Sequence, residues 1–266
     1  MTSSTWEWTA YGQTDRGLVR RSNQDRFLVD NRHRLWVVAD GMGGQPGGDV
    51  ASRLVVDTLA DFAPTLSLSP ATPDATEEER AIFRLTAMVD HAHAAILARA
   101  DHEPPLQGMG TTLVAAHLLA DSTPRLVVVN VGDSRAYLIR DETITQLTRD
   151  HTLVEERLRD GRITQDEAAQ HPDRHVLTRA MGLGPTIVGD IFVYDLMEGD
   201  LLLLCTDGLT KMLADDRILQ TALPHRYSPS LCTAALITAA LEEGGIDNVT
   251  VVACASTAPL GPANSH

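Results

Sequence analysis

The chain has 266 residues, of which 43% are hydrophobic and 22% are charged, and its formal net charge is −14. This composition is typical of a soluble globular protein with a substantial core. No apolar run approaches the roughly 20 residues that a membrane-spanning helix needs. The acidic balance, without a basic stripe, argues against nucleic acid and membranes as partners.

The compartment is indicated by the N-terminus and by the cysteines. The first ten residues lack the basic segment and the apolar segment of a secretory signal. The cysteines are too few and too scattered for a disulfide framework or a zinc site, and we interpret them as small core residues: Cys205, Cys232 and Cys254. We therefore expect a cytoplasmic protein.

The first part of the chain predicts strands and then two helices. β-branched and alternating runs predict short strands at 6–11, 27–30 and 35–39. Apolar side chains at helical spacing predict a helix that ends near Phe62, and a Pro/Ser/Thr-rich connector follows at 63–75. The capping-box sequence Thr76-Glu-Glu-Glu79 predicts a long helix that ends before Pro104.

A strand-rich block follows, at 111–119, 125–131, 136–139 and 143–147. Its short polar breaks, with no helix between the strands, indicate antiparallel pairing. The last third of the chain predicts strands at 187–194, 200–205 and 249–255, with helices at 215–223 and 229–243.

Residues 148–180 differ from both parts because they are polar and poor in apolar residues. The capping-box patterns that begin at Thr152 and Thr164 predict two short helices, and Gly161 would end the first. We expect this insert to be a surface flap.

Histidines are not gathered into a metal-binding pattern. His91 and His93 are two apart on a predicted helix, so their rings should point apart, and we expect both to be solvated. His171 and His175 lie in the flap, where solvated histidines are the default and contact with a substrate is the alternative.

The chain shows no internal repeat and no linker between two cores. We expect one domain over 1–255 and a disordered tail over 256–266. Helices in pairs and strands in two groups favour two antiparallel sheets covered by helices.

Four aspartates share one local pattern, in which a strongly apolar strand ends or begins beside Gly or Asn. They are Asp40, Asp133, Asp207 and Asp247. Starts and ends of antiparallel strands meet at one edge of a sheet, so we expect these carboxylates to lie together there. They would repel each other unless cations lay between them, and ligation by oxygen alone favours Mg²⁺, Mn²⁺ or Ca²⁺ over Zn²⁺. Four unrelated Asp turns are the alternative.

A carboxylate-bridged pair of metal ions would support one chemistry in particular. It activates a bound water and stabilises both oxygens of an in-line displacement at phosphorus. Such a site also needs a cation that holds the phosphate, and Arg16, Arg20 and Arg21 lie in the polar loop before the second predicted strand. A solvated loop is the alternative reading of these arginines.

Eight motifs occur together in order along nearly the whole chain, from about Tyr11 to Ala255. They are RRSNQD at 20–25, VADGMGG at 38–44, GMGTT at 108–112, NVGDSRAY at 130–137, LTRDH at 147–151, LTRAMG at 177–182, CTDGL at 205–209 and DNVTV at 247–251. The set resembles the metal-dependent protein phosphatases of type 2C, in their compact bacterial serine/threonine form.

The resemblance implies an α+β fold, a four-layer αββα sandwich in which pairs of helices flank two antiparallel sheets, with a flap near 148–180. It implies direct hydrolysis of phosphoserine and phosphothreonine on proteins by a water that bridges two Mn²⁺ or Mg²⁺ ions, without a covalent phosphoenzyme. Asp40 would bridge both ions, and the Gly41 carbonyl would help to hold the first. Asp207 and Asp247 would complete the second, and Asp133 would share a third, weaker ion with Asp207.

Arg20 and Asp25 are the other catalytic residues that the resemblance implies: Arg20 would bind the substrate phosphate, and Asp25 would hydrogen-bond a metal-bound water. Two positions depart from the family pattern. Met42 stands where many eukaryotic members have a candidate acid, a histidine, and Gln24 replaces a frequent glutamate. A metal-bound water or a flap histidine could supply the proton instead.

The expected partners are phosphorylated proteins, either targets of a serine/threonine kinase or the kinase itself, and we expect a monomer. Two alternatives stay open. One is a partner-switching phosphatase that acts on a single phosphorylated regulator, and the other is a metal-binding scaffold without turnover, which the complete aspartate set argues against.

Overall fold

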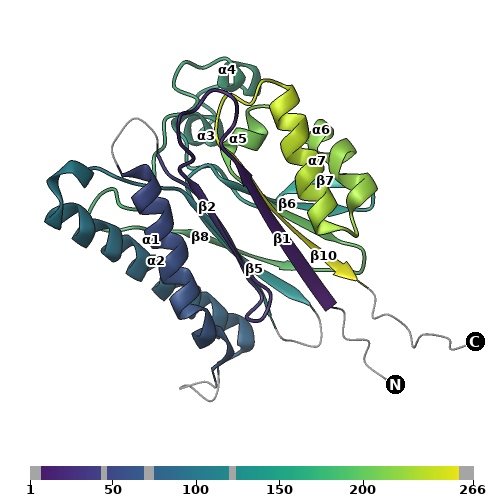
Figure 1. Cartoon of the computed structure of the whole chain (residues 1–266), viewed down its shortest axis with the longest axis horizontal. Coiled ribbons are helices and arrows are strands. Elements are labelled where there is room, and N and C mark those ends of the chain that lie inside the picture. Colours follow the sequence, from purple (N-terminus) through teal and green to yellow (C-terminus); the bar gives the residue numbers. More distant parts are fainter. Residues whose placement is uncertain (1–6, 43–46, 69–74, 120–123, 258–266) are drawn as a thin grey trace, which may run out of the picture.

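Two five-stranded antiparallel sheets form the centre of the molecule (Figure 1). The computed structural model describes residues 7–42, 47–68, 75–119 and 124–257. The first sheet has the order β1 (Glu7–Asp15), β10 (Val249–Thr257), β9 (Leu201–Cys205), β6 (Arg135–Arg140) and β7 (Thr143–Gln146). The second has the order β2 (Asp25–Asp30), β3 (Leu35–Asp40), β4 (Leu113–Leu118), β5 (Arg125–Val131) and β8 (Asp190–Asp195).

A pair of helices covers the outer face of each sheet (Figure 1). The second sheet is covered by α1 (Gly48–Phe62) and α2 (Glu77–His102), and the first by α6 (Asp215–Ala222) and α7 (Pro229–Glu242). Short 3₁₀ segments follow α1, α2 and α6, at Ala63–Ser67, Pro104–Leu106 and Leu223–His225. The expected αββα sandwich is confirmed.

Strand alternation divides the buried side chains into three cores. In β3, Leu35 and Val37 pack against α1 and α2, while Trp36 and Val38 point into the core between the sheets. Both faces of β9 are equally apolar, so Leu203 packs under α7 and Leu204 packs between the sheets. The three cysteines are free and buried in these cores, as expected.

The helix starts agree with the capping patterns. Thr76 and Glu79 exchange both bonds of a capping box at the start of α2. Thr164 and Glu167 do the same at α4 (Gln165–Ala169), and the Thr152 hydroxyl accepts from the Glu155 N–H at α3 (Leu153–Arg159). These two short helices form the flap, which lies at the end of the sandwich opposite the start of β1 and the end of β10 (Figure 1).

Some boundaries differ from the sequence prediction. β8 begins at Asp190 rather than 187, and β1 continues to Asp15 because all nine of its residues pair with β10. β10 reaches Thr257, so residues 256 and 257 belong to the strand and not to the expected tail; residues 258–266 lie outside the described part. The expectation of a solvated His93 is wrong. The side chain is 4% exposed, and its Nδ1 accepts from the Gly182 N–H at 3.0 Å.

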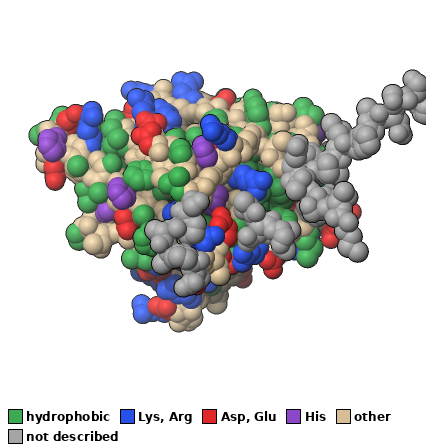
Figure 2. All heavy atoms as spheres, turned by 90° about the horizontal axis from the view of Figure 1, so that it is seen from below, with side chains coloured by type: hydrophobic (Ala, Val, Ile, Leu, Met, Phe, Trp, Pro, Cys, Tyr) green, Lys and Arg blue, Asp and Glu red, His purple; other side chains and the backbone are tan. Residues whose placement is uncertain are grey.

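Surface charges of both signs are mixed on the face opposite the flap, where no continuous basic area is visible among the described residues (Figure 2). Within the part of the chain that the structure describes, no helix has the length and apolarity to cross a membrane.

Candidate active site

The four aspartates lie at the flap end of the sandwich and line one cavity of about 450 Å³. The expectation of a single sheet edge is wrong, because both sheets contribute. Asp40 ends β3 in one sheet, while Asp207 and Asp247 follow β9 and precede β10 in the other. Asp133 lies in the turn from β5 to β6, where the chain crosses between the sheets. The cavity is thus the place where the ends of both sheets meet.

The main chain of Asp40 is fixed by the two threonines of the GMGTT motif. The Asp40 N–H donates to Thr112 Oγ1 at 3.0 Å, and its carbonyl accepts from the Thr111 hydroxyl at 2.8 Å and the Thr112 N–H at 2.9 Å. Gly41 follows in close contact with α1, where a Cβ would lie 2.2 Å from the Gly48 carbonyl oxygen. This contact requires glycine. The other two glycines of the motif, Gly43 and Gly44, lie outside the described residues.

A short helix, α5 (Asp207–Thr210), presents Asp207, and the sequence did not predict this helix. It begins directly after β9 and packs against the 247–248 turn so closely that a Cβ on Gly208 would lie 1.8 Å from the Asn248 carbonyl oxygen. Asn248 fixes the arginine loop as well, because its Nδ2 donates to the carbonyls of Arg16 and Ser22. Asn248 is therefore a positioning residue to which the sequence analysis assigned no role.

Burial and repulsion from neighbouring carboxylates raise the pKa values of Asp40 and Asp133. The pKa of Asp40 lies well above its usual range, because the group is desolvated and faces Asp25, Asp207 and Asp133. Desolvation, followed by repulsion from Asp207, raises the pKa of Asp133 to about 7. In the metal-free chain the cluster is therefore charged only at a cost.

Asp25 lies directly beneath this cluster. It is the antiparallel partner of Asp40 in the β2–β3 pair and is fully buried. Its Oδ2 accepts from the hydroxyls of Thr206 at 2.9 Å and Thr250 at 2.7 Å. Desolvation raises its pKa from 3.8 to about 7, although the two hydroxyls act in the opposite direction.

Two cations hold the outer carboxylates. Arg20 contacts both oxygens of Asp247, with Nε 2.7 Å from Oδ1 and Nη2 2.8 Å from Oδ2. Lys211 Nζ lies 2.5 Å from Asp207 Oδ2 and 3.0 Å from Asp247 Oδ2. Burial alone would raise the pKa of Asp247, but the bonds from Arg20 and Lys211 outweigh it and lower that pKa. The sequence analysis missed Lys211, although its place four residues after Asp207 was a usable signal.

Asp207 and Asp25 each keep one oxygen, Oδ1, that is buried without a hydrogen-bond partner in the described structure. Unpaired carboxylate oxygens in an acidic cavity fit a hard divalent cation. In the described ranges, no group of three or more His, Cys, Asp or Glu side chains is arranged so that it could already hold a metal ion. Lys211 and Arg20 instead hold oxygens of Asp207 and Asp247. The donor set fits metal ions, and the carboxylate oxygens that Lys211 and Arg20 hold must be released before they bind metal.

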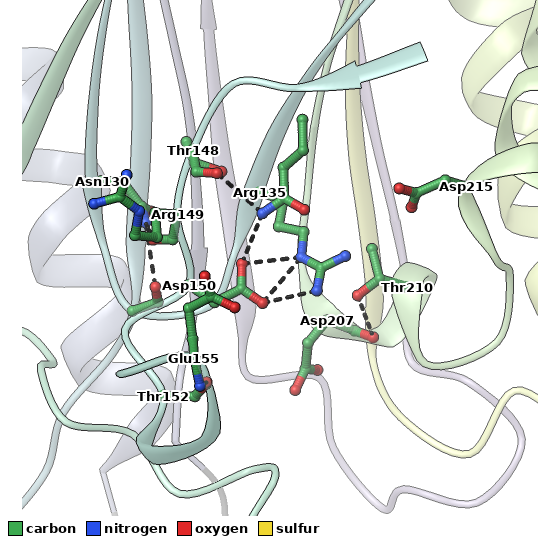
Figure 3. Close-up of polar contacts among 12 residues, drawn as sticks. Asn130, Arg135, Thr148, Arg149, Asp150, Thr152, Glu155, Asp207, Thr210 and Asp215 are labelled. Carbon is green, nitrogen blue, oxygen red and sulfur yellow. Dashed lines mark hydrogen bonds and ion pairs between the residues drawn. The ribbon is translucent and has the colours of Figure 1, made fainter. Parts of the chain in front are cut away.

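The flap closes one side of the cavity. Asp150, at its base, binds Arg135 of β6 through both carboxylate oxygens, and Figure 3 shows this pair beside Asp207. His175 reaches the cavity wall, whereas His171 contacts Arg157 within the flap. Burial and the nearby Lys211 lower the pKa of His175. A neutral imidazole at pH 7 is a poor proton donor, so His175 is a weak candidate for the general acid. Met42 cannot supply that proton either.

The helix-covered sandwich and its carboxylate cavity define a class of metal-dependent phosphohydrolases. The chain belongs to the protein phosphatase 2C family, whose model matches residues 18–242. The serine/threonine phosphatase stp of Listeria welshimeri is 40% identical over 243 residues, which cover 90% of this chain and 92% of that protein. The serine/threonine protein phosphatase PstP of Mycobacterium tuberculosis is 40% identical over 242 residues, 90% of this chain and 43% of that longer protein.

Solved structures agree with the fold. A crystal structure of the M. tuberculosis phosphatase PstP/Ppp has a TM-score of 0.81 at 38% identity, with 93% of this chain and 98% of that chain covered. The catalytic domain of PstP in complex with two manganese ions has a TM-score of 0.79 at 36% identity, with 95% and 100% covered. The family, the fold and the enzyme class expected from the sequence, a phosphoprotein phosphatase, are confirmed.

Proposed function

We propose that this chain hydrolyses phosphoserine and phosphothreonine esters of proteins at a centre of two Mn²⁺ or Mg²⁺ ions. The observation that carries the proposal is the meeting of Asp40, Asp133, Asp207 and Asp247 with Arg20 around one cavity. The unpaired Oδ1 of Asp207 supports a cation at this place. The two manganese ions in the related catalytic domain support the choice of metal.

The residues divide into ligands and substrate groups. Asp40, the Gly41 carbonyl, Asp207 and Asp247 would hold the two ions, and Asp133 with Asp207 would hold a third. When bound, the ions supply a water of lowered pKa and neutralise the phosphoryl charge. Arg20 lies at the cavity wall with its side chain 45% exposed, so its guanidinium can reach a phosphate that enters from solvent.

Asp25 would act from beneath the ligands. With one oxygen held by Thr206 and Thr250, the other is left free to accept a hydrogen bond from a water at the metal site. In the metal-free chain, burial raises its pKa to about 7.

A phosphatase assay tests the proposal. With Mn²⁺ or Mg²⁺ the purified chain should hydrolyse p-nitrophenyl phosphate and a phosphothreonine peptide, and EDTA should abolish both reactions because the carboxylates cannot activate water alone. Re-added Mn²⁺ should restore them. Binding of Mn²⁺ without turnover of any substrate would support the scaffold alternative. Hydrolysis of a single phosphorylated regulator, with no hydrolysis of phosphopeptides, would support the partner-switching alternative.

Arg20→Ala is expected to raise the KM for a phosphopeptide by about 10-fold, with a smaller change in kcat, because Arg20 would bind the phosphate already in the ground state. Steady-state kinetics at saturating Mn²⁺ would measure both constants. Arg21→Ala is the matched control, since Arg21 is the exposed neighbour in the same loop. An unchanged KM in Arg20→Ala with a raised KM in Arg21→Ala would transfer the role to Arg21.

The comparisons support phosphoproteins as substrates, and the biological setting belongs to the proposal. We propose that its substrates are the targets of a serine/threonine kinase, or the kinase itself. We also propose that the chain is a cytoplasmic monomer. The free, buried thiols of all three cysteines suit a reducing compartment. We also take residues 7–257 as one catalytic domain, because the core between the sheets joins strands from both halves of the chain.

A further inference from the structure

Lys211 is the only lysine among the 266 residues, and it lies in the candidate active site. It is the residue directly after α5 and lies one helical turn after Asp207. Its ammonium group bridges Asp207 and Asp247, at 2.5 Å and 3.0 Å from their Oδ2 atoms. The side chain is only 22% exposed, so this bridge is largely shielded from solvent.

The bridge joins two groups that the proposed function assigns to the metal ions. Carboxylates that lie this close repel each other, and a cation between them relieves that repulsion. In the metal-free chain the ammonium provides this relief, and Arg20 supplies the second positive charge to Asp247. A divalent ion that binds the Oδ2 atoms of Asp207 and Asp247 must therefore displace Lys211 from them.

The structure offers a place for the displaced side chain. Lys211 also lines a neighbouring cavity of about 660 Å³ between the flap and α6. Its wall includes Glu155, Asp215, which accepts from the Tyr137 hydroxyl, and Asp150, which is paired with Arg135 (Figure 3). Arg174 is a second cation there. A rotation of the flexible lysine stem would move the ammonium out of the metal site into this cavity, toward the carboxylates of Glu155 and Asp215.

We propose that Lys211 is a displaceable internal counter-ion of the metal centre. It neutralises Asp207 and Asp247 in the metal-free chain, moves toward the flap cavity when they bind metal, and thereby sets a lower metal affinity than the carboxylates alone would have. This inference rests on the proposed assignment of Asp207 and Asp247 as metal ligands.

Titration of the metal-free chain with Mn²⁺ by isothermal calorimetry tests the proposal. Lys211→Met keeps the length of the side chain and removes its charge. We expect it to tighten Mn²⁺ binding by about fivefold or more, the range of two partly exposed ion pairs, and to lower the Tm of the metal-free chain. Lys211→Arg keeps the charge and should stay within about twofold of the wild-type Kd.

Arg140→Met is the matched control for charge. It removes one positive charge from a carboxylate partner, Asp200, at the other end of β6, and should leave the Kd for Mn²⁺ unchanged. An equal Kd in wild type and Lys211→Met, or weaker binding in Lys211→Met, would overturn the inference. Absence of any Mn²⁺ binding by the wild-type chain would instead overturn the proposed function beneath it.

A second measurement tests whether Lys211 moves away when Mn²⁺ binds or stays in place and only repels the ion. Because Lys211 carries the only side-chain amine, its reaction with an amine-directed acylating reagent can be followed by mass spectrometry of the peptide that contains it. Saturating Mn²⁺ should increase the rate of Lys211 acylation several-fold, while the rate at the α-amino group stays constant. An unchanged or slower rate at Lys211 would show that the ammonium stays in place, which contradicts the inference.

Discussion

Asp40→Asn is expected to lower kcat/KM toward a phosphothreonine peptide by about 10²–10³-fold or more, the range for loss of one preorganised electrostatic group. Asp40 is the carboxylate on which the cluster converges, with Asp25, Asp133, Asp207 and Asp247 all raising its pKa. An amide keeps the shape of the side chain and removes the charge that would bridge two cations. The hydrogen bonds that fix this position are made by the main chain, so the fold should survive.

The same substitution should not destabilise the metal-free chain. It removes one buried charge from a set of like charges, so we expect the free energy of unfolding to rise by about 1 kcal/mol, as is common when a functional site is neutralised. Urea unfolding in EDTA measures this, and calorimetry with Mn²⁺ should show lost binding. Asp57→Asn, on the exposed side of α1, is the control. Wild-type turnover in Asp40→Asn would rule out a bridging role.

In the metal-free chain, the contribution of the Asp25 carboxyl to stability is expected to fall as the pH rises from about 4 to about 7. Asp25 has a pKa of about 7 in the folded chain and an ordinary value of 3.8, so between these values the folded state binds more protons than the unfolded state. This contribution is then highest below the ordinary pKa, falls through this window and is constant above it. The pKa difference corresponds to at most about 4 kcal/mol.

Comparison with Asp25→Asn isolates this effect from other titrating groups. Buried histidines such as His117 and His151 have lowered pKa values, so they destabilise the fold as the pH falls, which is opposite to the effect of Asp25. Their effect is the same in the wild-type chain and in Asp25→Asn. The free energies of unfolding should therefore differ more at pH 8 than at pH 5, in favour of Asp25→Asn. A difference independent of pH would show that the Asp25 carboxyl has an ordinary pKa in the folded chain.

Mn²⁺ should reverse the trend in the wild-type chain, because metal ligation requires ionised carboxylates. Saturating Mn²⁺ should therefore raise the Tm more at pH 8 than at pH 5. A larger stabilisation at pH 5 would contradict carboxylate ligation.

Local sequence was sufficient for most of the elements. Runs of apolar and β-branched residues predicted β3 and β5, and the Thr76 and Thr164 capping boxes predicted the starts of α2 and α4. These signals are local because a strand face or a helix cap is satisfied within a few residues. The same holds for the acidic turns that singled out Asp40 and Asp207 as candidate ligands before any fold was known.

Other features depended on residues that are distant in the sequence. Arg20 and Asp247 are 227 positions apart, and Asp25 meets Thr250 across 225 positions, so no local pattern could show either contact. His93 has the context of a solvated helix residue, yet it is buried because the 180–184 turn packs over α2. The position of each of these side chains is set by packing between elements.

The sequence by itself determined the family, the two-sheet composition and the aspartate set, because each leaves a signature in contiguous residues. Tertiary structure decided that the carboxylates come from the ends of both sheets, that Asp25 lies fully buried against Asp40, and that Lys211 bridges Asp207 and Asp247. The physical reason is that charges interact through space. Their pKa values and their need for cations therefore follow from distances and burial that only the folded chain defines.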